Sequence, residues 1–348
     1  MNLNGIGAEL SITVITETFN HGEGQSWSRV VGAIDAAISA AESFDDGNGD
    51  GPSEVLVVDA SNDDRTQTHI AGRQATTSVS LRHVRVPVDT PYDVIKDLGA
   101  LEASSAVIAY LDGDCRPVCD AAAWLKALFV ELKATGAPGV CGTTIYDGIS
   151  PVRRACSAMD FGFVLHRSDG VLAAYTSNNA MFRRDIRANT QADVDGLRCA
   201  CYLHAQYFLK TGAPMRHARS TDALVRHEFP PLWEERFRRG YDAVAVSWID
   251  PSLFEAKCFR RNRFVAATVG VARYMVSSVR LDARAIIGLE SYQRIGRIKV
   301  AAAIALVPLL RCIDVTGLWR ALFFGPNNRW RHTVTLDHVT NSSLDESP

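Results

Sequence analysis

The first half of the chain alternates short apolar runs with segments whose apolar residues recur at helical spacing. Apolar, β-branched runs with little polar alternation are typical of strands buried on both faces. Strands that alternate with helices predict an α/β fold with a doubly wound, mostly parallel sheet. The predicted strands lie at 10–15, 54–58, 80–86 and 106–111. The predicted helices lie at 27–41, 93–102 and 121–135.

The pattern becomes less regular after Gly142, and we interpret the segments that follow it as substrate-side insertions. Farther on, helices are predicted at 197–210, 233–239, 264–279 and 298–322, the last interrupted at Pro308. We therefore expect an α/β domain over 1–230, a helical and basic region over 231–332, and a polar tail over 333–348.

Composition places the chain among ordinary globular proteins, because 47% of its 348 residues are hydrophobic and 22% are charged. A formal net charge of -2 argues against a surface built to hold nucleic acid. The eight cysteines form no C-x-x-C pair and no secretory signal is present, which favours a reduced, cytoplasmic setting. Cys199 and Cys201 could hold zinc with His204, but thiols on a buried helix are the commoner explanation.

The C-terminal third is basic. Between residues 257 and 330 there are 13 Lys or Arg against Asp282, Glu290 and Asp314, a balance of +10. The apolar run at 300–310 is too short for the roughly 20 residues that a membrane span needs. Either it is a core helix, or this region rests peripherally on an anionic membrane surface at the inner face of the cell membrane.

Asp112-Gly113-Asp114 directly follows the predicted strand at 106–111. Two carboxylates one residue apart can share Mg²⁺ or Mn²⁺, and such an ion adds phosphate oxygens from a substrate. Ligands of open α/β sheets bind just beyond the carboxyl ends of the strands. Asp-Gly-Asp is also a common turn sequence, so the triplet alone does not identify a metal site.

Two more polar clusters follow predicted strands. Thr18-Phe19-Asn20 comes after the first strand, and the segment from Asp59 to Asp64 comes after the second. Because parallel strands end at the same edge of a sheet, we expect these clusters and Asp112-Gly113-Asp114 to meet in one crevice.

The order of these three motifs resembles the nucleotide-binding half of the inverting family 2 glycosyltransferases, which have the GT-A fold, over roughly residues 10–228. The resemblance implies a GT-A domain over 1–230 that moves one sugar from a nucleotide-diphosphate sugar to an acceptor hydroxyl with inversion. It also implies Mg²⁺ or Mn²⁺ as cofactor and a glycan acceptor, and attachment to a membrane would make a lipid-linked acceptor the natural substrate. The Gln-x-x-Arg-Trp motif of processive members has no match before Arg329-Trp330, which favours single-sugar transfer.

The resemblance carries roles to individual residues. Asp114 would bind the metal most directly, with Asp112 assisting and His227 approaching it. Asp59 would hold the nucleobase or ribose. The remaining residues expected to bind the nucleotide sugar are Thr18, Phe19, Asn20, Asp64, Asn178 and Asn179. Arg236, Arg238 and Arg239 could neutralise the leaving diphosphate, although a solvated basic helix face explains any one of them.

Three departures from the family pattern matter. The second motif reads Asp59-Ala60-Ser61, without the usual second carboxylate and glycine, and Glu17 stands where the family often has proline. The position of the family's catalytic base corresponds to Ala200 and Cys201. An inverting transfer needs a base for the acceptor proton. The candidates are Asp195, then Asp193, with Tyr202 and His204 as further ones.

Other functions remain as alternatives. A dehydrogenase is disfavoured because Gly5-Ile6-Gly7 precedes the first strand instead of following it. In haloacid-type phosphatases Asp-x-Asp usually lies near the start of the domain, whereas here two strand units come first. A sugar-nucleotide-binding or scaffold protein of the same fold, without turnover, is the alternative that the missing base supports.

Overall fold

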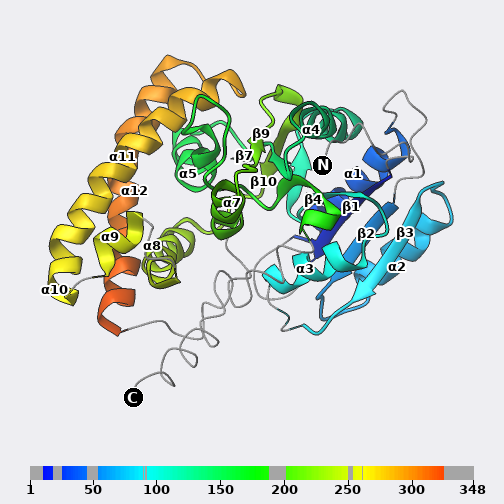
Figure 1. The fold of residues 1–348 in the computed structure, drawn as a ribbon, viewed down its shortest axis with the longest axis horizontal. Coiled ribbons are helices and arrows are strands. Elements are labelled where there is room, and N and C mark those ends of the chain that lie inside the picture. The colour runs from blue at the N-terminus through cyan, green and yellow to red at the C-terminus, as the bar shows by residue number, and fades with distance from the viewer. Residues whose placement is uncertain are drawn as a thin grey trace. The chain divides into compact units, whose positions relative to one another are not determined.

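A computed structural model describes residues 11–18, 26–44, 54–88, 90, 92–187, 201–249, 254–260 and 262–324. Two compact units are present, an α/β unit that ends near Glu228 and a helical unit formed mainly by the chain from Phe229 onward (Figure 1). The segment Gly148–His166 also belongs to the helical unit, although it precedes residue 230 in the sequence. The expected polar tail lies outside the described residues.

The α/β unit contains a seven-stranded sheet in the order β3-β2-β1-β4-β8-β6-β9. All neighbouring strands pair in parallel except β8, which is antiparallel to both β4 and β6. The sheet is therefore mostly parallel, as predicted. Its strands are β1 Ile12–Thr18, β2 Glu54–Asp59, β3 Ser80–Arg85, β4 Val107–Leu111, β6 Gly139–Cys141, β8 Asn179–Arg183 and β9 Arg216–His217.

Successive residues of a strand face opposite sides of the sheet, and both sides of this sheet are covered. Val14, Val57 and Ala109 belong to one hydrophobic cluster with Ile34 and Leu128 of two covering helices. On the other side, Gly99 lies against Ile15 and Val58, where a larger residue would collide. The helices of this unit are α1 Trp27–Glu42, α2 Arg65–Gln74, α3 Tyr92–Glu102, α4 Ala121–Thr135, α7 Cys201–Lys210 and the short η3 Thr221–Ala223.

A second, three-stranded sheet has the order β5-β10-β7, with β5 Cys115–Pro117, β10 Leu224–His227 and β7 Thr143–Tyr146. β10 is antiparallel to β5 and parallel to β7, and its register pairs His227 with Cys115. This pairing brings a histidine from the end of the unit to the residue next to Asp114.

The helical unit is held together by close helix packing. At Gly240 of α8 an added Cβ would collide with the backbone of Asp314, and at Gly317 of α12 with the backbone of Phe237. The two helices therefore approach at their glycines. The elements of this unit are α5 Pro151–Phe161, η2 Gly162–Leu165, α8 Leu232–Ile249, α9 Phe254–Phe259, α10 Arg263–Val265, the π-helical η4 Ala266–Gly270, α11 Val271–Gly288, η5 Leu289–Ser291 and α12 Arg297–Phe324.

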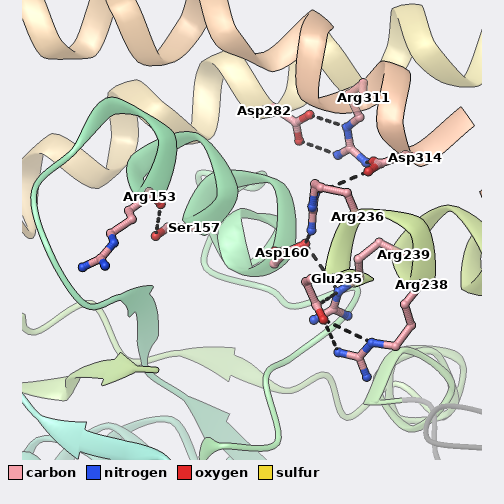
Figure 2. Close-up of polar contacts among 10 residues, drawn as sticks. All are labelled: Arg153, Ser157, Asp160, Glu235, Arg236, Arg238, Arg239, Asp282, Arg311 and Asp314. Carbon is pink, nitrogen blue, oxygen red and sulfur yellow. Dashed lines mark hydrogen bonds and ion pairs between the residues drawn. The ribbon is translucent and has the colours of Figure 1, made fainter. Parts of the chain in front are cut away.

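A chain of buried charges joins four helices of this unit (Figure 2). Arg236 of α8 bonds to Asp160 of α5 and lies 3.7 Å from Asp314 of α12. Arg311 donates to Asp314 at 2.8 Å and, through two nitrogens, to Asp282 of α11 at 2.8 and 2.9 Å. The side chain of Arg236 is wholly buried, so a solvated helix face is the wrong explanation for it. Buried charges persist only when they are paired in this way.

Four elements differ from the expected pattern. α2 and α5 are helices that the periodicity did not indicate, and 179–183, expected in an insertion, forms strand β8. α12 runs unbroken through Pro308, contrary to the expected interruption. A helical proline removes one hydrogen bond. Here the buried side chains of Val307 and Leu310 anchor the helix on either side of it.

Candidate active site

The carboxyl ends of three neighbouring strands bring the acidic residues together. β1 lies between β2 and β4, and all three are parallel. Glu17 and Thr18 end β1, Asp59 ends β2, and Asp112 follows β4. Thr18 pairs in register with Asp59. Glu17 lies on the opposite side of the strand, the side on which Ile15 contacts α3. The sheet edge therefore carries two separate polar clusters.

Asp114 and His227 form the first part of the site. Nδ1 of His227 lies 2.6 Å from the carbonyl oxygen of Glu228, which can only accept, so Nδ1 carries the proton. In the neutral ring Nε2 then has a lone pair, and it lies 3.3 Å from Oδ2 of Asp114. Two electron-rich atoms facing each other need a cation or a proton between them. This pair fits a divalent ion, because two ligands of one ion are about 3 Å apart.

The backbone around this pair is fixed. The amide of Glu228 donates to the carbonyl of Asp114 at 3.1 Å, and the ring of Tyr146 packs edge-on against His227 with centroids 5.5 Å apart. The ligand atoms of Asp114, Cys115 and His227 all lie within 4.8 Å of one another. Burial raises the pKa of Cys115 well above its usual value, so the thiol keeps its proton and donates to Oδ1 of Asp114 at 3.5 Å.

Lys96 of α3 occupies the second part of the site. Its ammonium group donates to Oδ1 of Asp112 at 2.5 Å, to Oε2 of Glu17 at 3.1 Å and to the carbonyl of Ser177 at 3.3 Å. All three charged side chains are almost completely buried. Lys96 therefore fixes Asp112 in place and links the ends of β1 and β4.

Two carboxylates share this one ammonium. Burial alone would lower the pKa of Lys96, but the charges of Asp112 and Glu17 outweigh it and raise that pKa, so Lys96 stays charged. Burial, followed by repulsion from Asp112, raises the pKa of Glu17 well above its usual value. Burial raises the pKa of Asp114 as well, and His227 opposes that rise. Added positive charge at this edge would therefore stabilise the ionised forms of Glu17 and Asp114.

Asp59 lies in a separate cluster and its side chain is wholly buried. Its Oδ1 accepts from the hydroxyl of Thr18 at 2.6 Å and from the amide of Ser61 at 3.0 Å. Its Oδ2 lies 3.0 Å from Nε2 of His83 and accepts from Arg85 at 3.3 Å. Both oxygens are engaged by protein groups, and a contact of Asp59 with a nucleobase or ribose stays a prediction.

The Asp59 cluster predicts a pH-dependent contribution to stability. Burial alone would raise the pKa of Asp59, but the hydrogen bonds from His83, Ser61 and Thr18 outweigh it and lower the pKa from 3.8 to about 2. Since the folded pKa lies below the unfolded one, the contribution is complete above pH 4 and disappears as the pH falls toward 2. It amounts to about 2 kcal/mol.

We therefore expect Asp59→Asn to lower the free energy of unfolding by about 2 kcal/mol at pH 7 and by about half as much at pH 3. Urea unfolding of both proteins at several pH values measures this difference. Asp185→Asn, at an exposed position of the same unit, is the control. A difference that stays constant from pH 7 to pH 3 would contradict the assignment.

The other predicted residues are placed as follows. Asp64 is exposed and lies 3.5 Å from Arg85. Asn178 accepts from Thr144 at 2.9 Å. The side chain of Asn179 accepts from Trp124 at 2.9 Å and donates to the carbonyls of Thr143 and Ala223, each at 2.9 Å, so it ties the two sheets to α4. Their contacts with a nucleotide sugar stay predictions.

Several predicted positions lie outside the described residues. They are Phe19, Asn20, Asp193, Asp195 and Ala200, and the side chains of Cys201, Tyr202 and His204 are likewise not described. In the described part of the chain, sequence reasoning missed Lys96, His83 and Arg85, and it named Glu17 without giving it a role. A signal for Lys96 exists, since it is a lone cation among Val94, Ile95 and Leu98 on a helix that precedes Asp112.

Neither a protein-family model nor a curated protein matches the chain. Among solved structures, it is similar to the mannosyltransferase PcManGT from Pyrobaculum calidifontis in complex with GDP-Man and Mn²⁺, with a TM-score of 0.56 and 14% identity over 91% of this chain and 88% of that one. It also matches GalNAc-T7 with UDP, GalNAc and Mn²⁺ at a TM-score of 0.44 and 11% identity, over 64% and 44% of the two chains. The match to TarS of S. aureus has a TM-score of 0.42 and 14% identity, over 90% and 55%.

The first of these likenesses covers both units and identifies the fold. The chain has the GT-A fold, with a mostly parallel central sheet between helices and a C-terminal helical region. The predicted fold class is confirmed.

Proposed function

We propose that this chain is a metal-dependent glycosyltransferase that moves a single sugar from a nucleotide-diphosphate sugar to an acceptor hydroxyl with inversion. The GT-A fold and the acidic strand ends support this function. The observation that carries it is the pair formed by Asp114 and His227, whose facing oxygen and nitrogen are 3.3 Å apart.

Asp114 and His227 would hold Mg²⁺ or Mn²⁺, and Asp112, which Lys96 holds in place, would assist. Such an ion supplies Lewis-acid stabilisation of the departing diphosphate. Hard oxygen ligands suit either metal, while the imidazole of His227 favours Mn²⁺ over Mg²⁺. Lys96 keeps Asp112 at a fixed position, so the donor meets a site that needs little rearrangement.

In the proposed reaction the acceptor hydroxyl attacks the anomeric carbon on the face opposite the leaving diphosphate, and the reacting sugar has oxocarbenium character. A base takes the hydroxyl proton. We assign this role to Asp195 ahead of Asp193. We assign the neighbourhood of Asn178 to the sugar and acceptor, and the acceptor itself to the class of glycans or lipid-linked hydroxyl compounds.

A transfer assay tests this function. UDP-sugars and GDP-sugars are incubated with the full chain, Mn²⁺, and either short oligosaccharides or lipid-linked oligosaccharides, and the products are analysed by NMR. We expect metal-dependent release of nucleotide diphosphate and a product whose anomeric configuration is opposite to that of the donor. In the same assay we expect Asp195→Asn to reduce transfer about 100-fold, with Asp193→Asn as the matched control.

Retention of the donor's anomeric configuration would contradict the inverting mechanism. Binding of a sugar nucleotide without transfer or hydrolysis would instead identify the alternative, a sugar-nucleotide-binding protein of the same fold. The absence of a carboxylate at positions 200 and 201 favours this alternative.

A further inference from the structure

The start of α10 lies near the end of α12 in the helical unit (Figure 1). These two elements carry four exposed aromatic side chains. The rings of Phe264 and Phe323 have centroids 6.1 Å apart, and the indole of Trp319 donates to the carbonyl of Ala267 at 3.0 Å. Phe324 is the last described residue of α12. These four residues, Phe264, Trp319, Phe323 and Phe324, are called the aromatic patch.

The aromatic patch is strongly exposed. Phe264 and Phe324 are 69% and 74% exposed, and Trp319 is 47% exposed. Single exposed apolar residues are ordinary, but a contiguous group of large ones marks an interaction site. A tryptophan with a satisfied N–H and an exposed ring is typical of side chains at a membrane–water boundary.

The exposed apolar surface continues from the aromatic patch along η4 and α11. Val265, Val269 and Val276 follow at intervals of four and seven residues, which places them on one side of the helix. All three are exposed. The patch therefore belongs to a longer apolar stripe.

Arginines border this surface. Arg263 adjoins Phe264, the guanidinium of Arg320 lies 4.7 Å from the centroid of the Phe324 ring, and Arg280 and Arg284 are exposed farther along α11. The acidic residues of α11, η5 and α12 are turned to internal partners. Asp282 and Asp314 are bound to Arg311 in the interior, and Glu290 pairs with Arg154. Apart from the buried Arg311, the positive charge of these elements is mainly outside, and most of their negative charge is inside.

We propose that the aromatic patch docks this protein on the surface of an anionic lipid bilayer. The aromatic rings enter the headgroup region, where amphipathic side chains are favoured, and the bordering arginines pair with lipid phosphates. Charge complementarity selects an anionic bilayer as the occupant. This docking does not depend on the proposed transfer activity, but it would bring a lipid-linked acceptor to the protein.

Docking on the surface agrees with the distribution of charge along α11. Among the described residues, one helical stretch, Arg263–Ser291, is long and apolar enough to cross a membrane by length and composition. Arg280 and Arg284 are exposed in its second half, however. An arginine at the centre of a bilayer is energetically costly. The stretch is therefore assigned to the interface.

Flotation with lipid vesicles tests the proposal. The full chain is mixed at low salt with vesicles of phosphatidylcholine alone or with about 30% phosphatidylglycerol, enough to give a negative surface. We expect the chain to float with the anionic vesicles and to be released by 0.5 M NaCl, roughly one order of magnitude above low-salt buffer, because screening shortens the range of charge attraction. The double variant Phe264→Ser, Phe324→Ser is expected to bind at least about tenfold less.

Val130→Ser is the matched control, because Val130 is an exposed apolar residue of α4 in the other unit. Circular dichroism shows whether each variant is folded, and a folded double variant that floats like the wild type would contradict the proposal. So would the absence of flotation, or binding that resists both salt and alkaline carbonate, which indicates insertion. Self-association that the double variant abolishes, without vesicle binding, would assign the patch to a second copy of the chain.

Discussion

Asp114→Asn is expected to lower the rate of sugar transfer about a thousandfold, within the range for removing one essential charge-stabilising group. Asparagine keeps the shape of the side chain but removes the negative charge that faces Nε2 of His227 at 3.3 Å. The metal would then lose its most direct carboxylate. Steady-state kinetics with Mn²⁺ measure the effect on transfer, and calorimetric titration with Mn²⁺ alone measures the loss of metal affinity.

Asp185→Asn serves as the control for this variant, because Asp185 is an exposed acid of the same unit that pairs with Arg183. The control should bind Mn²⁺ as the wild type does. Unchanged Mn²⁺ affinity in Asp114→Asn would remove Asp114 from the metal site. Lower affinity with undiminished transfer would show that the metal does not take part in the reaction.

Lys96→Met is expected to lower the free energy of unfolding by about 3–5 kcal/mol, the usual cost of removing one partner from a buried ion pair. Methionine matches the length of lysine but leaves the carboxylates of Glu17 and Asp112 without their shared cation. Both are buried with it, and Lys96 donates to them at 3.1 and 2.5 Å. Urea unfolding measures the loss.

A second substitution distinguishes lost charge pairing from lost packing. In the double variant Glu17→Gln, Lys96→Met one of the two carboxylates is neutral, so we expect it to regain a large part of the lost stability. Lys133→Met, on the exposed end of α4, should change stability by less than about 0.5 kcal/mol. A double variant that is less stable than Lys96→Met would contradict the charge account.

The strand ends of the α/β unit were predictable because apolar runs mark buried strands and polar residues mark where they stop. Asp59 and Asp112 lie at the ends that the pattern indicated, and the parallel order of β2, β1 and β4 brings them to one edge. The positions of these strand ends depend on the local hydrophobic pattern, so they can be predicted from the sequence.

Contacts across the fold were not predictable in the same way. Lys96 meets Asp112 because α3 packs on one particular side of the sheet, and Glu17 joins them because it faces that side. The spacing of apolar residues shows that one face of a strand is apolar, but it does not show which helix packs against that face. Likewise, Arg236 is polar in the sequence and becomes buried only because Asp160 and Asp314 arrive from α5 and α12.

The central claim is that Asp114 and His227 hold a divalent ion that the donor diphosphate needs, and thermal unfolding of the wild-type chain with sugar nucleotides tests it most directly. A ligand that binds the folded state raises the apparent stability according to its concentration and affinity. We predict that at least one UDP-sugar or GDP-sugar stabilises the chain with Mn²⁺ present and does not do so with EDTA. Equal stabilisation under the two conditions would contradict the claim.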